Sequence, residues 1–217
     1  LAGFVLNKFR GDATLLAPGP EQLQALTGVP LLGVLPMHRD HGLPEEDGLY
    51  GPPTGGVSEG PRVAIVAWPH LSNLDEFQPL VAVASVRWVR TASELDGADW
   101  IVLPGSKQVS GDLAWLKAQG LDTAIVRHAR AGRPVLGICG GLQALGALLD
   151  DPDGVDGEAH GPLPGLGLLA LATHYAAPKR LRAAPVQFAD LAEGAGPWQA
   201  FSSLRWPAYE IRCGRTQ

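Results

Sequence analysis

The sequence predicts an α/β protein whose main part, residues 62–217, is an open, mainly parallel sheet with helices on both faces. From Arg62 onward, short apolar runs alternate with helix-like segments, and alternation of this kind implies parallel strands joined by helical crossovers. The composition, 46% apolar and 18% charged over 217 residues, indicates a chain that can bury a sizeable core.

The first 36 residues predict a short strand–helix–strand unit. Its elements are a strand at 3–7, a helix at 19–27 and a strand at 29–35. The unit is too small for a domain and should expose apolar surface. Since the chain begins at Leu1, without Met and inside a predicted strand, we expect a piece of a longer protein; an alternative start or processing would look the same. Residues 37–61, rich in Gly, Pro and acidic residues, are predicted to be a linker.

The main part divides into strands and helices by its apolar periodicity. The predicted strands are 63–68, 81–89, 100–103 and the run that ends before Cys139, and the predicted helices are 74–80, 112–119, 121–131 and the segment after Cys139. A turn is expected at 151–154, and the remainder, from Gly165 through Ile211, is predicted to be antiparallel.

Charge and cysteine content exclude several classes of protein. The net charge of -5 is mild and unclustered, which argues against nucleic acid or an anionic membrane as the main partner. No apolar run approaches the roughly 20 residues that span a bilayer, and the apolar start is too short for a signal peptide. Two cysteines without framework spacing suggest a reducing, cytoplasmic setting.

The segment RPVLGICGGLQALG at 133–146 is the most informative motif. An apolar strand ends at Cys139, and Gly137 and Gly141 remove side chains where a sharp turn would clash. The residues predicted to form the packed helix that follows are Leu142, Ala144, Leu145, Ala147 and Leu148. A thiol at a helix start is favoured as thiolate and can attack a carbonyl carbon. The alternative, a cysteine that only fills space in the core, stays open.

A second loop is expected beside this cysteine. The run at 100–103 ends at Pro104-Gly105-Ser106, and active sites of parallel sheets gather at the carboxyl ends of strands. The loop and Cys139 are therefore predicted to share one crevice.

These and further segments together resemble the cobyric acid synthase family. The matching segments run in order: NKFRGD (7–12), GVLP (33–36), LPEED (43–47), SN (72–73), LPGSK (103–107), DLAWL (112–116), GICGG (137–141), GLGLL (165–169), YEI (209–211) and GRT (214–216). The resemblance implies a class I glutamine amidotransferase-like, flavodoxin-like domain at 62–217, truncated at its C-terminus. It also implies that residues 1–36 are the end of a P-loop ATPase-type synthetase domain.

The resemblance assigns roles to four residues. Cys139 would attack the glutamine side-chain amide to form a thioester and release ammonia. The backbone N–H groups of Gly105 and Gly140 would stabilise the oxyanion, and Gln143 would contact bound glutamine. A plain turn glycine at 105 and a structural role for Gln143 stay open. No metal site is expected here; ATP and Mg²⁺ would belong to the missing synthetase domain, which amidates carboxylates of adenosylcobyrinic acid a,c-diamide, a corrinoid, to give cobyric acid.

The sequence departs from the family at the catalytic base, because an imidazole must accept and return protons. In the family one histidine lies beyond the segment that matches 209–216, and another follows Tyr-Glu-Ile, where this chain has Arg212. The six histidines of the chain match neither motif and are interpreted as surface residues, His128 on a polar helix face: His38, His41, His70, His128, His160 and His174. No catalytic histidine is assigned.

Two classes of function remain open. One is the glutaminase part of an ATP-dependent amide ligase; the other is a degenerate, non-catalytic amidotransferase-like module. Among enzymes, cobyrinate diamide synthase and the amidotransferase of peptidoglycan precursors are the related alternatives, and the segments at 7–12 and 104–107 favour cobyric acid synthase over both.

Overall fold

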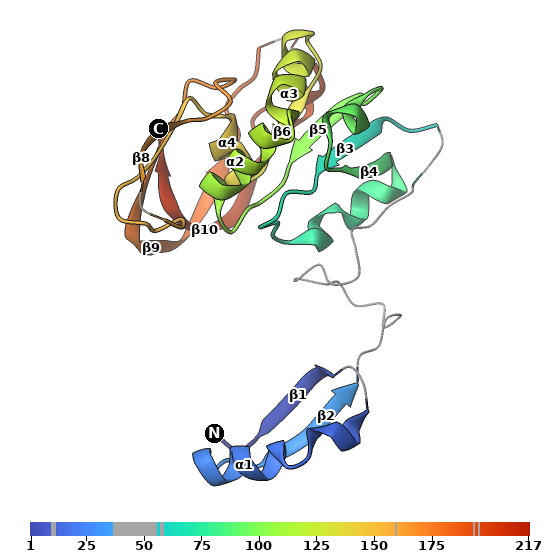
Figure 1. Cartoon of the computed structure of the whole chain (residues 1–217). Helices are drawn as coiled ribbons and strands as arrows, with labels where there is room; N and C mark the ends of the chain where they lie inside the picture. The colour runs from blue at the N-terminus through green and yellow to red at the C-terminus, as the bar shows by residue number, and fades with distance from the viewer. Residues whose placement is uncertain (10–11, 37–55, 57–58, 159, 193, 195) are drawn as a thin grey trace. The chain divides into compact units, whose positions relative to one another are not determined.

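The computed structural model describes residues 1–9, 12–36, 56, 59–158, 160–192, 194 and 196–217. The chain divides into two compact units, residues 1–44 and 45–217 (Figure 1). Most of the predicted linker, 37–61, lies outside the described residues. Within the described residues, no helix has the length and apolar character needed to cross a membrane.

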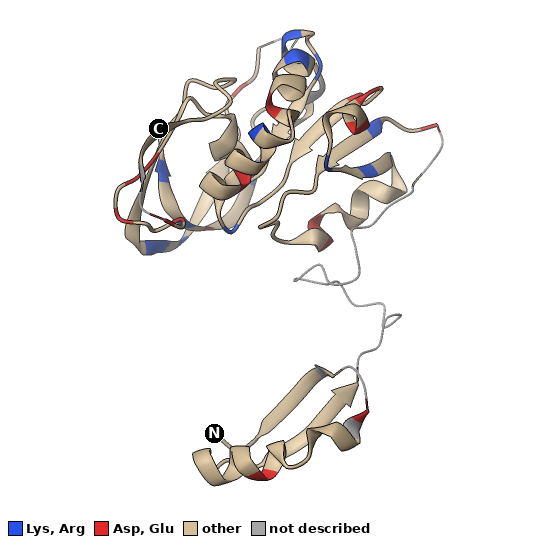
Figure 2. Cartoon of the chain, in the orientation of Figure 1, with Lys and Arg blue, Asp and Glu red and all other residues tan. Residues whose placement is uncertain are grey.

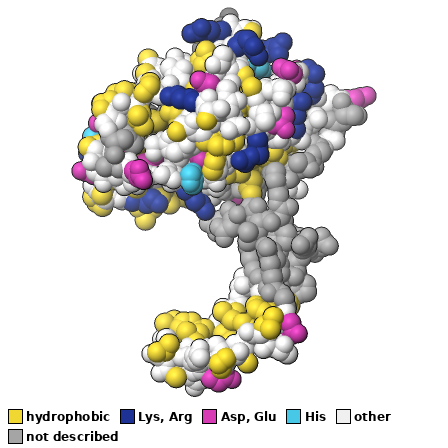
Figure 3. All heavy atoms as spheres, in the orientation of Figure 1, with side chains coloured by type: hydrophobic (Ala, Val, Ile, Leu, Met, Phe, Trp, Pro, Cys, Tyr) yellow, Lys and Arg dark blue, Asp and Glu magenta, His cyan; other side chains and the backbone are white. Residues whose placement is uncertain are grey.

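The first unit is the predicted strand–helix–strand. Strands β1 (Phe4–Phe9) and β2 (Leu31–Pro36) pair in parallel, and the 3-10 turn η1 (Ala13–Leu16) and helix α1 (Gly19–Thr27) connect them. No residue of α1 is buried. Leucines remain exposed over the unit, among them Leu15, Leu26, Leu32 and Leu35 (Figure 3). A two-stranded sheet with one helix has too few layers to cover its apolar side chains.

The second unit is built on a four-stranded parallel sheet with the strand order β4-β3-β5-β6. The strands are β3 (Arg62–Val66), β4 (Ser85–Val89), β5 (Trp100–Leu103) and β6 (Val135–Gly137). All three pairings are parallel, as the alternation of apolar runs and helices predicted. The carboxyl ends of β5 and β6 therefore lie side by side at one edge of the sheet.

Both faces of this sheet are covered. Helices α2 (Val109–Ala118), α3 (Leu121–Arg130) and α4 (Gly140–Leu145) pack on one face, and the 3-10 segment η2 (Leu74–Ala82) packs on the other. A short 3-10 turn, η3 (Ala92–Leu95), precedes β5. Strand β3 supplies both cores by alternation: Ala64 and Val66 face the helices, whereas Val63 and Ile65 face η2.

A second sheet, mostly antiparallel, follows with the strand order β10-β9-β7-β8. Its strands are β7 (Leu148–Asp151), β8 (His160–Pro164), β9 (Ala172–Gln187) and β10 (Arg205–Thr216). Strands β9 and β10 form a long hairpin, and η4 (Gly196–Phe201) in its connection returns to the first sheet through an edge contact of Trp198 with Trp100, 5.2 Å between ring centroids.

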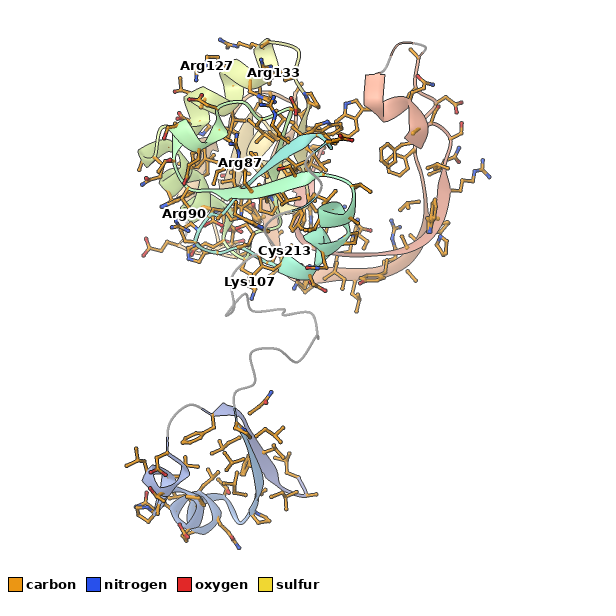
Figure 4. The ribbon with its side chains drawn as sticks, turned by 90° about the vertical axis from the view of Figure 1, so that its right-hand side faces the viewer. Arg87, Arg90, Lys107, Arg127, Arg133 and Cys213 are labelled. Carbon is orange, nitrogen blue, oxygen red and sulfur yellow. The ribbon has the colours of Figure 1, made fainter. Side chains whose placement is uncertain are left out.

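The outer part of this hairpin extends away from the parallel sheet (Figure 4). Paired residues alternate between its two faces, so one face carries Leu181 with Ile211 and the other carries Arg180 with Arg212. Six Lys and Arg residues lie on the two strands against one acidic residue, Glu210, although the chain as a whole is acidic (Figure 2). Glu210 forms ion pairs with Arg180, Arg182 and Arg212.

Two helix boundaries differ from the prediction because of contacts distant in sequence. Helix α2 begins at Val109 instead of residue 112, since the Asp156 carboxylate accepts hydrogen bonds from Val109 N and Ser110 N at 3.1 and 2.9 Å. The helix after Cys139 ends at Leu145; Leu148, predicted to continue it, begins strand β7. There the chain turns so that Ala147 N donates to Leu171 O at 2.7 Å.

Two further predictions need correction. The strand predicted at 81–89 begins only at Ser85, because the preceding apolar residues form the end of η2 and pack against Phe77. His128, interpreted as lying on a polar helix face, is buried on α3, where its ring Nε2–H donates to Pro134 O at 3.3 Å. Burial lowers the pKa of His128, so the imidazole is a neutral core residue.

Candidate active site

Cys139 lies between strand β6 and helix α4, as predicted, and is exposed. Its backbone has φ 50° and ψ -107°, a conformation that L-residues rarely adopt. The strand side of the turn is fixed by Ile138 N donating to Leu103 O at 2.9 Å, and the helix side by Gln143 N donating to Cys139 O at 3.2 Å. A strained backbone that presents a thiol at a strand–helix turn matches the geometry of a nucleophile.

Three glycines make this turn sterically possible. A β-carbon on Gly141 would lie 2.0 Å from Leu103 O, and one on Gly137 would lie 2.7 Å from Gly141 O. A β-carbon on Gly140 would lie 2.9 Å from Ser106 N. Since each neighbouring atom belongs to the backbone, none can move aside cheaply. The sequence prediction that Gly137 and Gly141 remove clashes agrees with the structure, which adds Gly140 to them.

The loop after β5 lies against this turn. The contact between Gly140 and Ser106 places the carboxyl end of β5 next to the start of α4. Gly105 itself is buried, and a β-carbon there would lie 2.4 Å from Ser72 Oγ. The loop after β5 and the turn at Cys139 are therefore in contact, as predicted, and Gly105 and Gly140 lie on the two sides of that contact.

The same loop is anchored to a buried carboxylate. Asp112 on α2 is fully buried and accepts hydrogen bonds from Ser106 Oγ at 2.6 Å, from His70 N at 3.0 Å and from His70 Nδ1 at 3.0 Å. In the sequence, Asp112 stands out only as part of the segment DLAWL (112–116) that matches the family. Its position on the otherwise apolar stripe formed with Val109, Leu113 and Leu116 was the signal for a buried polar role.

Gln143 lies one helical turn after Cys139 and is half-buried. The phenol of Tyr175 on β9 donates to Gln143 Oε1 at 3.0 Å. A β-carbon on Gly214 would lie 2.3 Å from Gln143 Nε2, so the amide nitrogen faces β10 across a glycine. Tyr175, which the sequence analysis missed, thus orients the side chain that was predicted to contact glutamine.

Tyr175 is buried and lies within electrostatic range of both cysteines. Burial raises the pKa of the Tyr175 phenol well above its usual range, and negative charge on Asp156, Asp151, Cys139 and Cys213 raises it further. A phenol with so high a pKa stays protonated and remains a hydrogen-bond donor. Both cysteine sulfur atoms therefore lie within electrostatic reach of the buried end of β9.

Three described histidines are held by neighbouring groups. His174 is half-exposed and bonds through Nδ1 to Asp150 Oδ2 at 3.0 Å. Because side chains alternate along a strand, His174 points to the face opposite its neighbour Tyr175, which bonds to Gln143. His70 is tied through Nδ1 to Asp112, and His128 is buried in the core. His38 and His41 lie outside the described residues.

Arg212 occupies the position where the family resemblance implies a histidine. Its NH1 donates to Gly214 O at 2.6 Å, and its Nε bonds to Glu210. It lines a cavity of about 290 Å³ on the hairpin together with Lys179, Arg180, Cys213 and Arg215. An arginine cannot serve as a proton acceptor at neutral pH.

A metal-binding cluster is not found among the described residues, where no group of three or more His, Cys, Asp or Glu side chains is placed to hold an ion. Both cysteines are free. The exposed thiol of Cys139 at a strand–helix turn is the nucleophilic group that this part of the structure presents.

We expect Cys139 to react faster than Cys213 with a small alkylating agent. Cys139 is exposed at a strained turn, whereas Cys213 is only partly exposed and packs against the core. A brief iodoacetamide pulse followed by peptide mass spectrometry measures both sites in one sample. Equal labelling, or faster labelling of Cys213, would contradict an accessible nucleophile at residue 139.

The chain is similar in sequence to known proteins over its whole length. The profile of the CobB/CobQ-like glutamine amidotransferase domain matches residues 62–217. The chain is 57% identical over 226 residues to cobyric acid synthase of Methylibium petroleiphilum, and 57% identical over 221 residues to cobyric acid synthase of Variovorax paradoxus. Each match includes 100% of this chain and 44% of the relative, so the chain spans less than half the length of the curated relatives it matches.

Among solved structures, a glutamine amidotransferase crystal structure matches 70% of each chain at 16% identity, with a TM-score of 0.45. A similarity of this size does not support a fold assignment, which rests on the strand order and on the turn at Cys139.

Proposed function

The chain belongs to the family of CobB/CobQ-like glutamine amidotransferase domains, and from that premise we propose that residues 62–217 release ammonia from glutamine with Cys139 as the nucleophile. The observation that carries this proposal is the exposed thiol on a strained strand–helix turn, beside the buried glycines Gly105 and Gly140.

The reaction follows from the positions of these groups. The Cys139 sulfur forms a bond to the amide carbon, the carbonyl oxygen becomes negative, and the N–H groups of Gly105 and Gly140 stabilise that charge. The carbon–nitrogen bond then breaks, and ammonia leaves with a proton from the general acid. Water adds to the thioester, and its collapse frees glutamate and the thiol. We place the imidazole that carries these protons outside residues 1–217.

Gln143 is proposed to bind the substrate. Because Tyr175 occupies the amide oxygen of Gln143, the amide nitrogen remains the donor available to a ligand. An oriented donor one turn from the nucleophile can hold a carboxylate or carbonyl oxygen of glutamine. The buried Tyr175 would fix this orientation before substrate arrives.

The whole protein is proposed to be a cobyric acid synthase of cobalamin biosynthesis. The relatives that support this carry the name cobyric acid synthase and are more than twice as long as the chain. The ammonia would pass to a synthetase domain that uses ATP and Mg²⁺ to activate carboxylates of adenosylcobyrinic acid a,c-diamide. Residues 1–36 would be the end of that synthetase domain. The two free cysteines support a cytoplasmic location for such a protein.

A second candidate, a non-catalytic amidotransferase-like module, is favoured by one observation. Arg212, bonded to Gly214 O, stands where the family resemblance implies a histidine. Such a module would still bind glutamine in the crevice without hydrolysing it.

The test combines labelling and turnover on the same chain. We expect 6-diazo-5-oxo-L-norleucine, a glutamine analogue that alkylates thiols, to modify Cys139 and glutamine to protect against it. Glutamate release by the 217-residue chain should be about 10² to 10⁴-fold below that of a protein that includes the proposed histidine, because a positioned acid–base group contributes that much. Failure of the analogue to modify Cys139 would contradict the glutamine site. Full turnover by the chain would place the base within it.

A further inference from the structure

We infer that Asp112 is a positioning residue, which holds the N–H group of Gly105 in place for the oxyanion by tying the loop after β5 to helix α2. The inference rests on the proposed function, since it assigns a task to that same site. The juxtaposition that carries it is one buried carboxylate between two chain segments, at Ser106 on the oxyanion loop and at His70 on the segment beside it.

The burial of Asp112 is the first step. The side chain is 0% exposed, and a carboxylate removed from water is costly unless donors satisfy it. Here Ser106 Oγ donates to Oδ2 at 2.6 Å, while His70 N and His70 Nδ1 donate to Oδ1 at 3.0 Å each. Both oxygens are therefore occupied, and every donor comes from outside helix α2.

The second step is the contact with the oxyanion loop. Ser106 Oγ accepts a hydrogen bond from Gln108 N at 2.9 Å, so its own hydrogen is directed to Asp112. Ser106 directly follows Gly105, and its backbone nitrogen lies against Gly140. When Ser106 is fixed, the Gly105–Ser106 peptide is fixed as well, and so is the distance from Ser106 to the turn at Cys139.

The third step is the segment beside the loop. Leu71 and Ser106 form an antiparallel bridge, Ser72 N donates to Gly105 O at 3.0 Å, and Lys107 N donates to His70 O at 2.8 Å. Trp68 Nε1 also donates to Gly105 O at 3.2 Å. These bonds hold the carbonyl of Gly105 away from the crevice, and the two bonds from His70 to Asp112 fix the segment that makes them.

Helix capping does not explain the buried charge. The first N–H groups of α2, at Val109 and Ser110, are satisfied by Asp156. Asp112 N donates within the helix to Gln108 O at 3.1 Å, and the Asp112 side chain makes no bond to its own helix start. The Asp112 carboxylate instead connects the loop after β5, at Ser106, to the segment that contains His70.

The test compares two reactions of Cys139 in the 217-residue chain. The nitrile analogue of glutamine, L-2-amino-4-cyanobutanoate, adds to the thiol: the sulfur–carbon bond forms, one carbon–nitrogen π bond breaks, and the nitrogen takes a proton from water. The charge that develops on this nitrogen needs the same donors as the oxyanion. Iodoacetamide alkylates the thiol without them. The ratio of the two rates therefore reports donor geometry separately from thiol accessibility.

Asp112→Ala and Ser106→Ala are expected to slow nitrile addition by about 10-fold or more, because loss of one oxyanion donor costs about 10² to 10³-fold and its displacement somewhat less. The iodoacetamide rate should stay at the wild-type value. Asp112→Asn should recover part of the loss, since its amide oxygen can still accept from His70. Should Asp112→Ala fail to fold, Asp112→Asn and Ser106→Ala carry the comparison.

Asp99→Asn is the matched control. Asp99 accepts from Arg62 N, Nε and NH2 at the opposite edge of the sheet, where β3 and β5 begin, so its loss should leave both rates unchanged. Hydrogen exchange of the peptide that covers 103–108 is the second measurement. It should speed up in the Asp112 variants and not in Asp99→Asn.

The outcomes separate the two claims. Equal nitrile rates in wild type and the Asp112 variants, or unchanged exchange at 103–108, would overturn the role of Asp112 while the glutamine site stands. Parallel loss of nitrile and iodoacetamide reactivity would show a general structural defect and would overturn it as well. Absence of any nitrile adduct on the wild-type chain would overturn the proposed nucleophile and, with it, this inference.

Discussion

Cys139→Ala is expected to abolish glutamine-dependent amide formation in the proposed full-length enzyme, while the reaction supplied with free ammonia continues. The thiol is the group that forms the bond to the glutamine carbon, and removal of a nucleophile in a hydrolase costs on the order of 10⁶-fold in kcat. Free ammonia bypasses that step, because it needs only the activated carboxylate. The measurement is product formation with glutamine and with ammonium as alternative nitrogen sources.

Cys213→Ala is the control for the loss of a sulfur atom near Tyr175. It should leave both nitrogen sources active, since Cys213 is assigned no step in the reaction. The nucleophile assignment fails if Cys139→Ala retains glutamine-dependent activity. Loss of both activities in Cys139→Ala would instead point to a structural role for the residue.

Gly141→Ala is expected to destabilise the second unit strongly. The added carbon would lie 2.0 Å from Leu103 O and 2.9 Å from Leu103 Cβ, on a strand within the sheet that neighbours both β3 and β6. Overpacking typically costs 1 to 3 kcal/mol, and a clash with strand backbone should reach about 3 kcal/mol or more in free energy of unfolding. Urea denaturation of the chain measures this value.

Gly161→Ala provides the comparison, because a β-carbon at Gly161 meets no atom of the described residues within 4 Å and its φ is not positive. Its free energy of unfolding should remain near that of the wild type. Similar stabilities of the two variants would mean that the turn can relax around a side chain. The close approach of α4 to β5 would then not depend on a glycine at 141.

The sequence predicts the elements of the fold correctly where the local apolar pattern and the tertiary contacts favour the same structure. The apolar run at 100–103 and the helix at 19–27 were predicted with the bounds of β5 and α1. The start of α2 was not, because its cap, Asp156, comes from 46 and 47 residues further along the chain. The run that precedes Ser85 satisfies a strand pattern as well as a packed 3-10 segment, and only the proximity of Phe77 selects the second.

The backbone turns of the candidate site could be predicted from the sequence. The side chains that support these turns could not. The turn positions of Cys139, Gly140 and Gly105 were predicted because turns that follow strands have a sequence signature, whereas their roles at the site were implied by the family resemblance and stay predictions. Tyr175 and Asp112 reach the site through tertiary contacts, with Gln143 and with Ser106. A one-dimensional pattern does not encode which side of β9 or α2 meets the crevice, so their roles emerge only from the folded chain.

The backbone conformation of Cys139 favours different residues for stability and for catalysis. Its φ of 50° is a conformation that glycine adopts without penalty and asparagine tolerates better than most, whereas cysteine pays of order 1 to 3 kcal/mol. Mutants selected only for resistance to heat or protease should therefore enrich glycine or asparagine at 139. Selection for nitrogen transfer should hold the thiol there despite its conformational strain. The residue found at position 139 therefore indicates whether selection in a lineage has acted on stability or on catalysis.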